Sequence, residues 1–428
     1  MKNLRWKVVA LCLAVAASTS AFAKPASTGS NPRPAGISTR VTDLDGVVYV
    51  DPRGHTLYTS PQDEPGKSNC RDTLYVRATR TFSGITYHFP ALEERRTCAQ
   101  SWPPLLASGV AKPVGDWTII DRPEGRKQWA FKGKPVYRSV LDQTPGDVNG
   151  VTSGPNGPRG YRPLTVDLGF PSGVTTRMTK WGRVLAPEQG SGILYVRDES
   201  EIQQASCDII CRSAWKPLLA SAMTESRGDW ATIPTARGVQ QWTFKGKALF
   251  MATRLREDNH LPPAEAPGWK PALYHPRPIP PSDITVTQSA AGLVYADRRG
   301  RTVYFFNCVE ETPDRQFCDV LGTTPITRVT FCGGPEKCMR NWRPVLASPK
   351  AKSDNRTWTV VKVDPKTGGR IDDSRADGLS VWAYRGRPLY TYYLDREPGD
   401  TYGDGVQLLS RLQVEMITVD FSAAGEDR

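Results

Sequence analysis

Short apolar runs alternate with turns rich in glycine and charge along most of this chain. Three stretches share the pattern: GVVYVDPRGHTLY (residues 46–58), GRVLAPEQGSGILY (182–195) and GLVYADRRGRTVY (292–304). In each, an alternating apolar run leads through a turn to a second run that ends in a tyrosine, Tyr58, Tyr195 or Tyr304. Period-two alternation indicates β-strands, and two such runs around a short turn indicate a β-hairpin.

A second pattern follows each of these hairpins. It reads CAQSWPPLLAS (98–108), CRSAWKPLLAS (211–221) and CMRNWRPVLAS (338–348), and in each copy the cysteine precedes the tryptophan by four residues. We expect Trp102, Leu105 and Leu106 to be core residues, because burying apolar surface stabilises a fold by about 25 cal/mol per Å².

The third pattern is QWAFKGKPVY (128–137), repeated as QWTFKGKALF (241–250) and VWAYRGRPLY (381–390). Period two places Trp129 and Phe131 on one face of a strand. Lys132 and Gly133 fit a two-residue turn, because glycine tolerates a positive φ, and Pro135 indicates an edge position or a bulge. The pattern predicts an amphipathic hairpin with its aromatic residues in the core.

Two interpretations of the basic residues in this hairpin stay open. Lys132 and Lys134 are solvated charges, or they surround an acidic or sugar ligand together with the aromatic rings. Arginine replaces lysine in the third copy, which suits a solvated charge better than a bidentate site. The tryptophan persists in all three copies, which suits a core position.

The repetition predicts an all-β protein of three tandem repeats with little helix. We place a flexible leader at 24–36, repeat one at 37–168, a degenerate repeat two at 169–256 and repeat three at 284–428. Residues 257–283 are rich in proline and predict a stiff, extended linker that separates repeat three from the first two. The segment between repeats one and two resembles a strand, so we expect those two to pack together.

Residues 1–23 have the pattern of a secretory signal peptide. Lys2, Arg5 and Lys7 precede an apolar run over residues 8–17, and the Ala21-Phe22-Ala23 sequence is typical of a cleavage site. No other long apolar run is present, so we expect an exported protein that does not span a membrane. Loss of these three bases lowers the formal net charge from +12 to +9.

Eight cysteines remain after this cleavage, and an even number in an exported protein predicts disulfides. Aligning the repeats pairs Cys70 with Cys98, Cys207 with Cys211 and Cys318 with Cys338, and leaves Cys308 and Cys332 to pair with each other. Spacing alone does not fix the connectivity, but the three copies agree. There is no C-x-x-C motif and the four histidines are scattered, so we expect no metal and no cofactor.

Taken together, these motifs resemble the bacterial family described as a secreted repeat of unknown function, whose members are predicted lipoproteins and periplasmic proteins with a Y-x-aromatic-x-x-D motif. Repeat three has the full motif in Tyr390, Tyr392 and Asp395. Repeat one keeps Tyr137 and Asp142 but has Ser139 at the aromatic position, and repeat two has Phe250 and Leu255 instead of the Tyr and the Asp. The resemblance implies an exported β-rich protein and no activity.

Candidate ligand-binding residues therefore lie just after the hairpins of repeats one and three: Tyr137, Asp142, Asp147, Tyr390, Tyr392, Asp395 and Asp400, with Lys132 and Lys134 beside them. A Tyr–Asp pair can equally be a buried hydrogen bond that fixes a β corner. The loops PGDVNG (145–150) and PGDTYGDG (398–405) can hold Ca²⁺ through oxygens or form Asx-turns, and they lack the bidentate Glu of a full calcium loop.

No Ser-His-Asp or G-x-S-x-G arrangement is visible, and a carboxylate pair such as Asp142 and Asp147 is available in any acidic loop. We therefore expect a non-enzymatic binding or structural protein of the cell envelope, periplasmic or secreted, with acidic envelope polymers or glycans as partners. The alternatives are a scaffold for another envelope protein and an enzyme acting on envelope glycans. No fold motif predicts specific nucleic-acid binding.

Overall fold

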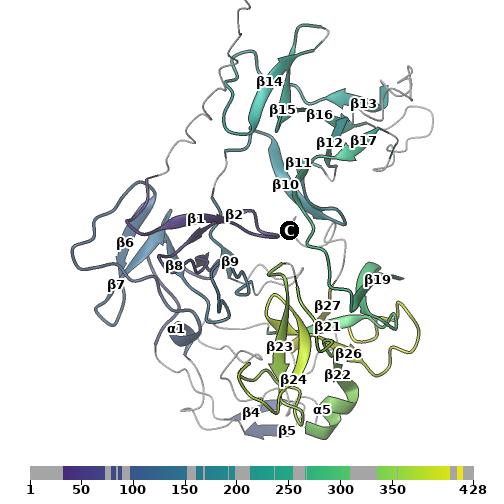
Figure 1. The fold of residues 1–428 in the computed structure, drawn as a ribbon. Coiled ribbons are helices and arrows are strands. Elements are labelled where there is room, and N and C mark those ends of the chain that lie inside the picture. Colours follow the sequence, from purple (N-terminus) through teal and green to yellow (C-terminus); the bar gives the residue numbers. More distant parts are fainter. Residues whose placement is uncertain are drawn as a thin grey trace, which may run out of the picture.

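The protein folds almost entirely into short antiparallel β-strands (Figure 1), which confirms the all-β prediction. The computed structural model describes residues 32–72, 79–82, 85–88, 97–151, 161–166, 169–190, 192–197, 213–235, 237–253, 266, 268–308, 335–353, 355–404 and 412–417. The predicted signal peptide lies outside these residues. Within them are the short helices α1 (Cys98–Ser101) and α5 (Pro335–Asn341), and no helix is long and apolar enough to cross a membrane.

The first strand set starts with a hairpin and continues into a five-stranded sheet in the order β6-β7-β8-β3-β9. A further hairpin, β4–β5, lies outside that sheet. The strands of this set are β1 (Ser38–Val41), β2 (Val47–Val50), β3 (Tyr58–Thr59), β4 (Thr79–Phe82), β5 (Ile85–His88), β6 (Trp117–Asp121), β7 (Lys127–Phe131), β8 (Lys134–Tyr137) and β9 (Arg162–Pro163).

The second strand set repeats this order as β14-β15-β16-β12-β17, with β13 paired to β16. Its leading hairpin, β10–β11, is extended by β18 into a three-stranded sheet. The strands are β10 (Val174–Thr179), β11 (Gly182–Pro187), β12 (Leu194–Arg197), β13 (Trp215–Pro217), β14 (Trp230–Pro234), β15 (Gln240–Phe244), β16 (Lys247–Ala252), β17 (Trp269–Pro271) and β18 (Leu273–Pro276).

The third strand set has the same order with one strand interrupted. β23-β24-β25 and β22-β26-β21-β27 form separate ladders, and β25 and β26 are consecutive in the chain. The strands are β19 (Ile284–Ser289), β20 (Gly292–Asp297), β21 (Val303–Cys308), β22 (Trp342–Pro344), β23 (Trp358–Val363), β24 (Leu379–Tyr384), β25 (Arg387–Pro388), β26 (Tyr390–Tyr392) and β27 (Leu412–Met416).

One backbone hydrogen bond connects the leading hairpin to the last strand region in every set. The amides of Tyr49, Leu185 and Tyr295 donate to the carbonyls of Leu164, Ala272 and Ile417 at 2.9, 2.8 and 3.0 Å. The three sets therefore share both their strand order and this connection. The exact boundaries between repeats stay a prediction.

Aromatic side chains fill the core of each set. In the first set, the Trp117 ring lies edge-on to Tyr49 and Phe131, with ring centroids 5.4 and 5.1 Å apart. Such pairs add about 0.5–1.5 kcal/mol each beyond the burial of their area. Trp129 and Phe131 are both buried in this core, as their spacing predicted. Trp102 and Leu105 are buried too, but the adjacent Leu106 is exposed, because neighbouring residues of an extended chain point in opposite directions.

The proline-rich segment is not simply a linker. Its residues 269–276 form β17 and β18, which pair with β12 and β11 of the second set. The prolines fall where a backbone donor is not required: Pro271 and Pro276 end their strands. The prolines alone therefore predicted a longer linker than the structure has.

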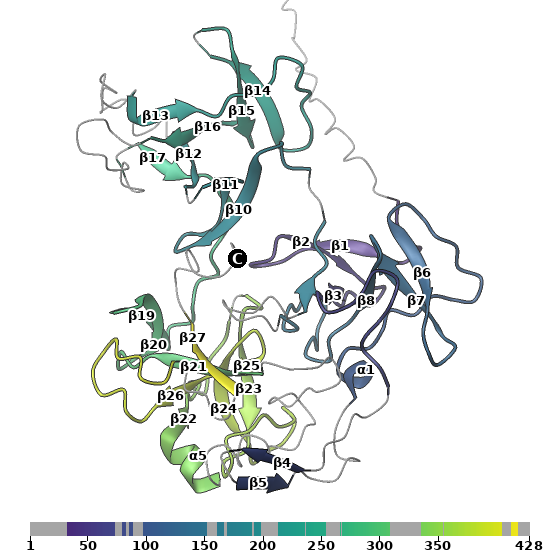
Figure 2. The same ribbon diagram turned by 180° about the vertical axis from the view of Figure 1, so that it is seen from behind.

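The three sets meet near the turn between β1 and β2, as both ribbon views show (Figures 1 and 2). We call its residues, Asp43, Leu44 and Asp45, the acidic turn. Arg183 of the second set donates to the Leu44 carbonyl at 2.9 Å, and residues of the third set bind both aspartates. The expectation that repeat three is separated from the first two is therefore wrong. An extended linker does not prevent contact, because it still allows the third set to pack on the first.

Candidate functional site

The predicted site in the first set is a buried Tyr–Asp corner. The Tyr58 hydroxyl donates to Asp142 Oδ2 at 2.8 Å, and the Asn149 amide donates to Asp142 Oδ1 at 2.7 Å. The Gly150 amide in turn donates to the Tyr58 hydroxyl at 3.2 Å. Burial raises the pKa of Asp142 and the pKa of Tyr58 well above their ordinary values. This network fixes the loop after β8 against β3.

The third set contains the same corner. The Tyr304 hydroxyl donates to Asp395 Oδ2 at 2.7 Å, and the Tyr402 amide donates to Asp395 Oδ1 at 2.9 Å. Burial raises the pKa of Asp395 to about 6. Asn149 and Tyr402 thus occupy equivalent positions, each donating its amide to the buried aspartate.

The tyrosine of each pair comes from the first hairpin, not from the Y-x-aromatic-x-x-D motif. Tyr137 instead lies within hydrogen-bond distance of Asp63 and Ser68, at 2.8 and 2.7 Å, and the Tyr390 hydroxyl donates to the Gly368 carbonyl at 2.7 Å. Sequence reasoning missed Tyr58 and Tyr304 as members of the site. Their signal was present, because a tyrosine ends the second apolar run in every copy.

The aspartate of each P-G-D loop accepts hydrogen bonds from backbone amides three and four residues before it, which differs from the predicted Asx-turn. Asp147 Oδ2 accepts from the amides of Gln143 and Thr144 at 3.1 and 2.8 Å. In the third set, Asp400 Oδ2 accepts from the amides of Arg396 and Glu397, both at 2.9 Å. These oxygens are already hydrogen-bonded, which leaves them poorly placed to hold Ca²⁺. Among the described residues there is no cluster of three or more His, Cys, Asp and Glu side chains suited to a metal ion.

Each loop is also tied to the leading part of its own set. The Thr56 hydroxyl donates to the Asp147 carbonyl and the Thr302 hydroxyl to the Asp400 carbonyl, both at 2.6 Å. The two loops are therefore built on the same framework, down to individual hydrogen bonds.

The base-Gly-base stretches form the predicted two-residue turns. Lys132, Lys245 and Arg385 have φ of 47°, 50° and 48°, and the glycine that follows each has φ between 71° and 76°. Positive φ at both central residues is the geometry that matches the twist of a two-residue hairpin. Pro135 pairs with Ala130 beside this turn, next to the Phe131–Lys134 pair that closes it.

The three turns differ in what surrounds them. Lys132 is exposed, whereas the Lys134 ammonium donates to the Asp63 carbonyl at 3.1 Å and the Gly133 carbonyl accepts from the Gly66 amide at 2.8 Å. All three residues of the Lys245–Lys247 turn are exposed. The turn Arg385-Gly386-Arg387 is packed against the first set.

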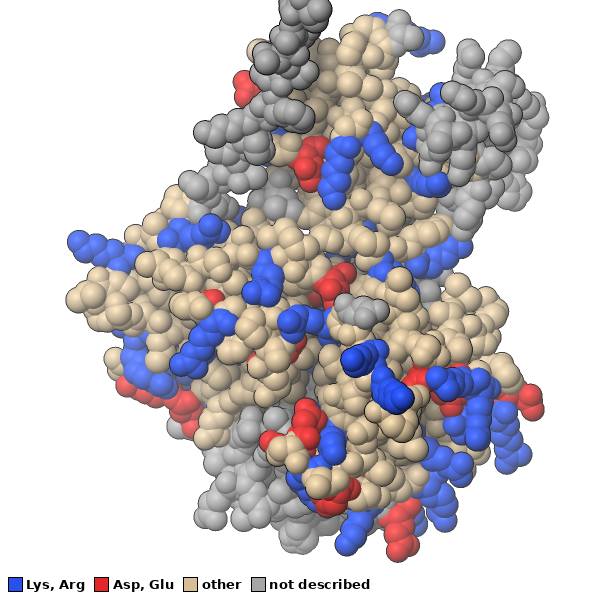
Figure 3. Space-filling view, in the orientation of Figure 1, with Lys and Arg blue, Asp and Glu red and all other residues tan. Residues whose placement is uncertain are grey.

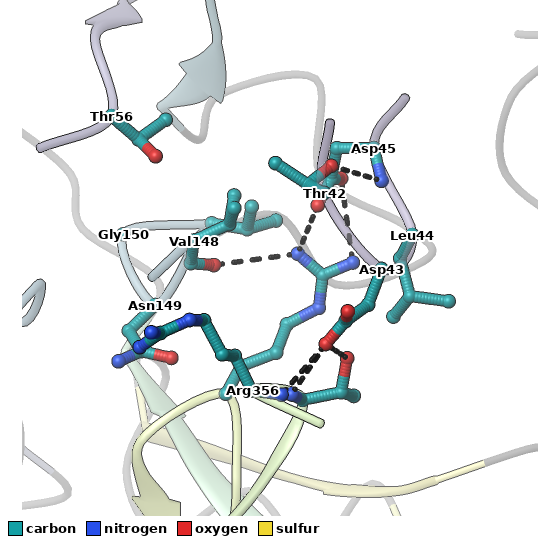
Figure 4. A network of polar contacts seen from close by, with 12 residues as sticks. Thr42, Asp43, Leu44, Asp45, Thr56, Val148, Asn149, Gly150 and Arg356 are labelled. Carbon is teal, nitrogen blue, oxygen red and sulfur yellow. Dashed lines mark hydrogen bonds and ion pairs between the residues drawn. The ribbon is translucent and has the colours of Figure 1, made fainter. Parts of the chain in front are cut away.

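The Arg385 turn binds a carboxylate and three backbone carbonyls of the first set. Arg385 donates to Asp45 at 3.0 Å and to the Val148 carbonyl at 3.4 Å (Figure 4). Arg387 donates to the Asn149 and Val151 carbonyls at 3.2 and 2.5 Å. Burial opposes the charge of Arg385, but the Asp45 carboxylate outweighs it and raises the pKa of Arg385. We call residues 148–151 the receiving loop.

A second contact supports the same docking. The backbone amides of Arg356 and Thr357 donate to Asp43 Oδ2 at 2.8 and 3.0 Å. The Arg356 side chain reaches Asp147 Oδ1 at 3.2 Å. Of the two interpretations of the basic residues, solvated charges or ligand-binding groups, the first does not hold for Arg385 and Arg387, which bind the first set. Sequence spacing within one repeat carries no information about contacts with another.

The structure does not gather the predicted binding residues into one open site. Tyr137, Asp142, Asp147, Tyr390 and Asp395 are buried, and Tyr392, Asp400 and Lys134 are partly buried. The tryptophans of the repeated hairpin do not form an exposed aromatic surface either, since Trp129 and Trp382 are buried and Trp242 is half-buried.

The predicted disulfide between Cys70 and Cys98 is confirmed. Cys98 begins α1, whose start is fixed by a capping box in which Thr97 and Gln100 exchange hydrogen bonds at 2.8 and 3.1 Å. Cys338 is also disulfide-bonded, to a partner outside the described side chains. The other predicted cysteines likewise lie outside them: Cys207, Cys211, Cys308, Cys318 and Cys332.

Comparison with known families gives one match. The model of a family described as a secreted repeat of unknown function matches residues 118–155 and 373–408. Both segments contain a base-Gly-base turn, the aspartate of a Tyr–Asp corner and a P-G-D loop. The resemblance is thus confirmed for two segments, in the first and third sets, and the second set is not matched. No curated protein and no solved structure matches the chain significantly.

Proposed function

We propose that this chain is an exported, non-enzymatic protein of the cell envelope, built from three copies of one repeat, that binds acidic envelope polymers or glycans. The pattern of residues 1–23 and the match to a secreted family support export, and the periplasm is the compartment that fits both. The second strand set, in which Leu255 stands at the position of the aspartate of the Y-x-aromatic-x-x-D motif, presents the binding surface.

The described part of the second set is basic. Its described residues between 169 and 271 include ten Lys and Arg but three Asp and Glu, whereas the whole stretch contains thirteen Lys and Arg and ten Asp and Glu. Figure 3 shows Lys and Arg spread over this face of the molecule, with smaller patches of Asp and Glu among them. A surface with such a charge excess attracts polyanions at low ionic strength.

The observation that carries the proposal is the Lys245-Gly246-Lys247 turn. It is exposed, and no described atom lies within 4 Å of the position of a Cβ on Gly246. Its counterpart in the third set binds the Asp45 carboxylate and three carbonyls. A turn with this geometry can therefore hold an acidic group at its first cation.

Recognition by this surface is electrostatic, because the repeated tryptophans are not exposed and offer no stacking platform. An enzymatic function has less support, since the carboxylates of Asp142 and Asp147 are held by hydrogen bonds. A scaffold for another envelope protein is a second candidate, favoured by the docking of one set on another through Arg385.

Binding of the mature chain to polygalacturonate, with neutral dextran as the comparison, tests the proposal. The wild type should bind the acidic polymer and lose it at high salt, because screening weakens contacts between exposed charges. Lys245→Glu with Lys247→Glu should weaken binding about tenfold, as expected for reversing two charges near a polyanion.

The matched control is Lys352→Glu with Lys366→Glu, which makes the same change of charge at exposed positions of the third set. Its binding should stay within about twofold of the wild type. Equal losses in both double variants, or equal binding to dextran, would contradict the assignment of the second set.

A further inference from the structure

In this structure the receiving loop of the first set is covered. The equivalent loop of the third set, residues 401–404, is not. In the first set, Asn149 is 5% exposed, and a Cβ on Gly386 of the docked turn would lie 3.0 Å from its side chain. In the third set, the equivalent Tyr402 is 64% exposed. The two positions share their backbone hydrogen bond to a buried aspartate, so the difference lies in what covers them.

The surface around Tyr402 also has more exposed aromatic and apolar groups than the equivalent surface of the first set. Tyr393 is 48% and Leu394 is 38% exposed, whereas Val140 and Leu141 at the equivalent positions of the first set are partly buried. In the first set the Asn149 side chain donates to the Leu141 carbonyl at 3.1 Å, which indicates that the equivalent Tyr402 and Leu394 also lie close together. Exposed side chains of this kind, gathered next to each other, indicate an interaction site more often than isolated ones do.

The element that fits such a loop is a base-Gly-base turn, and one of the three is open. The first turn is held by residues 63–66, and the third is docked on the receiving loop. The Lys245–Lys247 turn of the second set is the one whose surroundings are open among the described residues.

We propose that the Lys245-Gly246-Lys247 turn of one copy of this chain docks on the Tyr402 surface of a second copy, with contacts like those that Arg387 makes with the receiving loop. The Asp45 contact of Arg385 has no counterpart there, because the third set has Ala290-Ala291 at that turn. The lysine ammonium groups pack over the Tyr402 and Tyr393 rings and donate to the backbone carbonyls of residues 401–404. Gly246 allows the turn to approach the loop closely. Glu397 is exposed, its amide donates to Asp400 of the same loop, and its carboxylate complements the charge of the turn.

The contact joins two different surfaces of the same chain. Copies related in this way associate head to tail and form open chains, because each copy keeps one unused turn and one unused loop. Lysine offers a point charge where arginine offers a planar fork, so this contact is weaker than the one within the chain and depends on protein concentration.

Sedimentation of the mature chain over a range of concentrations tests the proposal. The wild type should form species that grow with concentration. Tyr402→Ala, and separately Lys245→Glu with Lys247→Glu, should each raise the dissociation constant at least tenfold. Lys352→Glu with Lys366→Glu should associate like the wild type.

Mixing the two defective variants gives a sharper result. The intact turn of the Tyr402→Ala chain can bind the intact loop of the Lys245→Glu, Lys247→Glu chain, and neither can extend further. The mixture should therefore form a dimer that does not grow with concentration, although each variant alone is monomeric.

A monomeric wild type, or a Tyr402→Ala chain that associates normally, would overturn the proposal. Its failure is distinct from failure of polymer binding, because the Tyr402→Ala chain keeps its second set unchanged and should bind polygalacturonate like the wild type.

Discussion

At the scale of single residues, the buried Tyr–Asp pair explains most of the repeated motif. Asp142 and Asp395 each receive a tyrosine hydroxyl and a backbone amide, and neither is open to solvent. The alternatives of ligand site and β corner were visible in the sequence. The sequence did not decide between them, because the tyrosine that binds each aspartate lies 84 or 91 residues away from it in the chain.

Removing one hydroxyl from this pair should destabilise the fold. Tyr304→Phe leaves Asp395 buried with one donor fewer, and an unsatisfied buried polar group costs about 1–3 kcal/mol. Urea unfolding should show this loss. The matched control, Tyr393→Phe, removes a hydroxyl from a half-exposed ring and should change the free energy of unfolding by less than about 0.5 kcal/mol. Equal effects would contradict the role given to Tyr304.

The raised pKa of Asp395 predicts an unusual pH dependence. Burial raises this pKa to about 6 in the folded state, above its ordinary value of 3.8, so the folded state binds the proton more tightly. The contribution of Asp395 to stability therefore increases as the pH falls from 7 towards 4. The free energy of unfolding of Asp395→Asn should lack this increase.

The control for the pH series is Asp116→Asn, at an exposed position. It should follow the wild-type curve between pH 4 and 7, because it leaves Asp395 and its partners unchanged. An Asp395→Asn curve parallel to the wild type would show that the carboxyl titrates normally.

At the scale of the element, the base-Gly-base hairpin was predicted from sequence and its environment was not. Strand alternation, the two-residue turn and the buried Trp129 and Phe131 all follow from local rules. The same local sequence lies in three different environments, however, because the residues around it come from other parts of the chain. Lysine or arginine in the turn does not reveal whether the turn is exposed or docked.

Two glycine substitutions separate turn strain from docking. Gly246 and Gly386 have φ of 76° and 71°, so Gly→Ala adds similar backbone strain of about 1–2 kcal/mol at either position. At 386 alone, the new Cβ would also meet Asn149 Cγ at 3.0 Å. Gly386→Ala should therefore lower the free energy of unfolding by about 1–3 kcal/mol more than Gly246→Ala. Thermal unfolding of both variants would measure the difference, and equal losses would argue against docking.

At the scale of the whole molecule, the acidic turn of the first set organises the arrangement. Asp43 binds the backbone at Arg356 and Thr357, and Asp45 binds Arg385. The three-fold repetition and the all-β class could be predicted, because every copy carries the same pattern. The packing of the third set on the first could not, because it depends on aspartates for which the other two copies have no counterpart: their turns read Lys180-Trp181 and Ala290-Ala291.

The central claim is that a base-Gly-base turn is a docking element, occupied within the chain by the turn of the third set. A cysteine pair at Asn149 and Gly386 tests it most directly, since a Cβ on Gly386 would lie 3.2 Å from Asn149 Cβ, close to disulfide geometry. Under oxidising conditions, the Asn149→Cys, Gly386→Cys chain should give the cross-linked peptide in high yield by mass spectrometry. The account predicts almost none from Asn149→Cys with Gly246→Cys. Equal yields from the two pairs, or no cross-link from either, would contradict it.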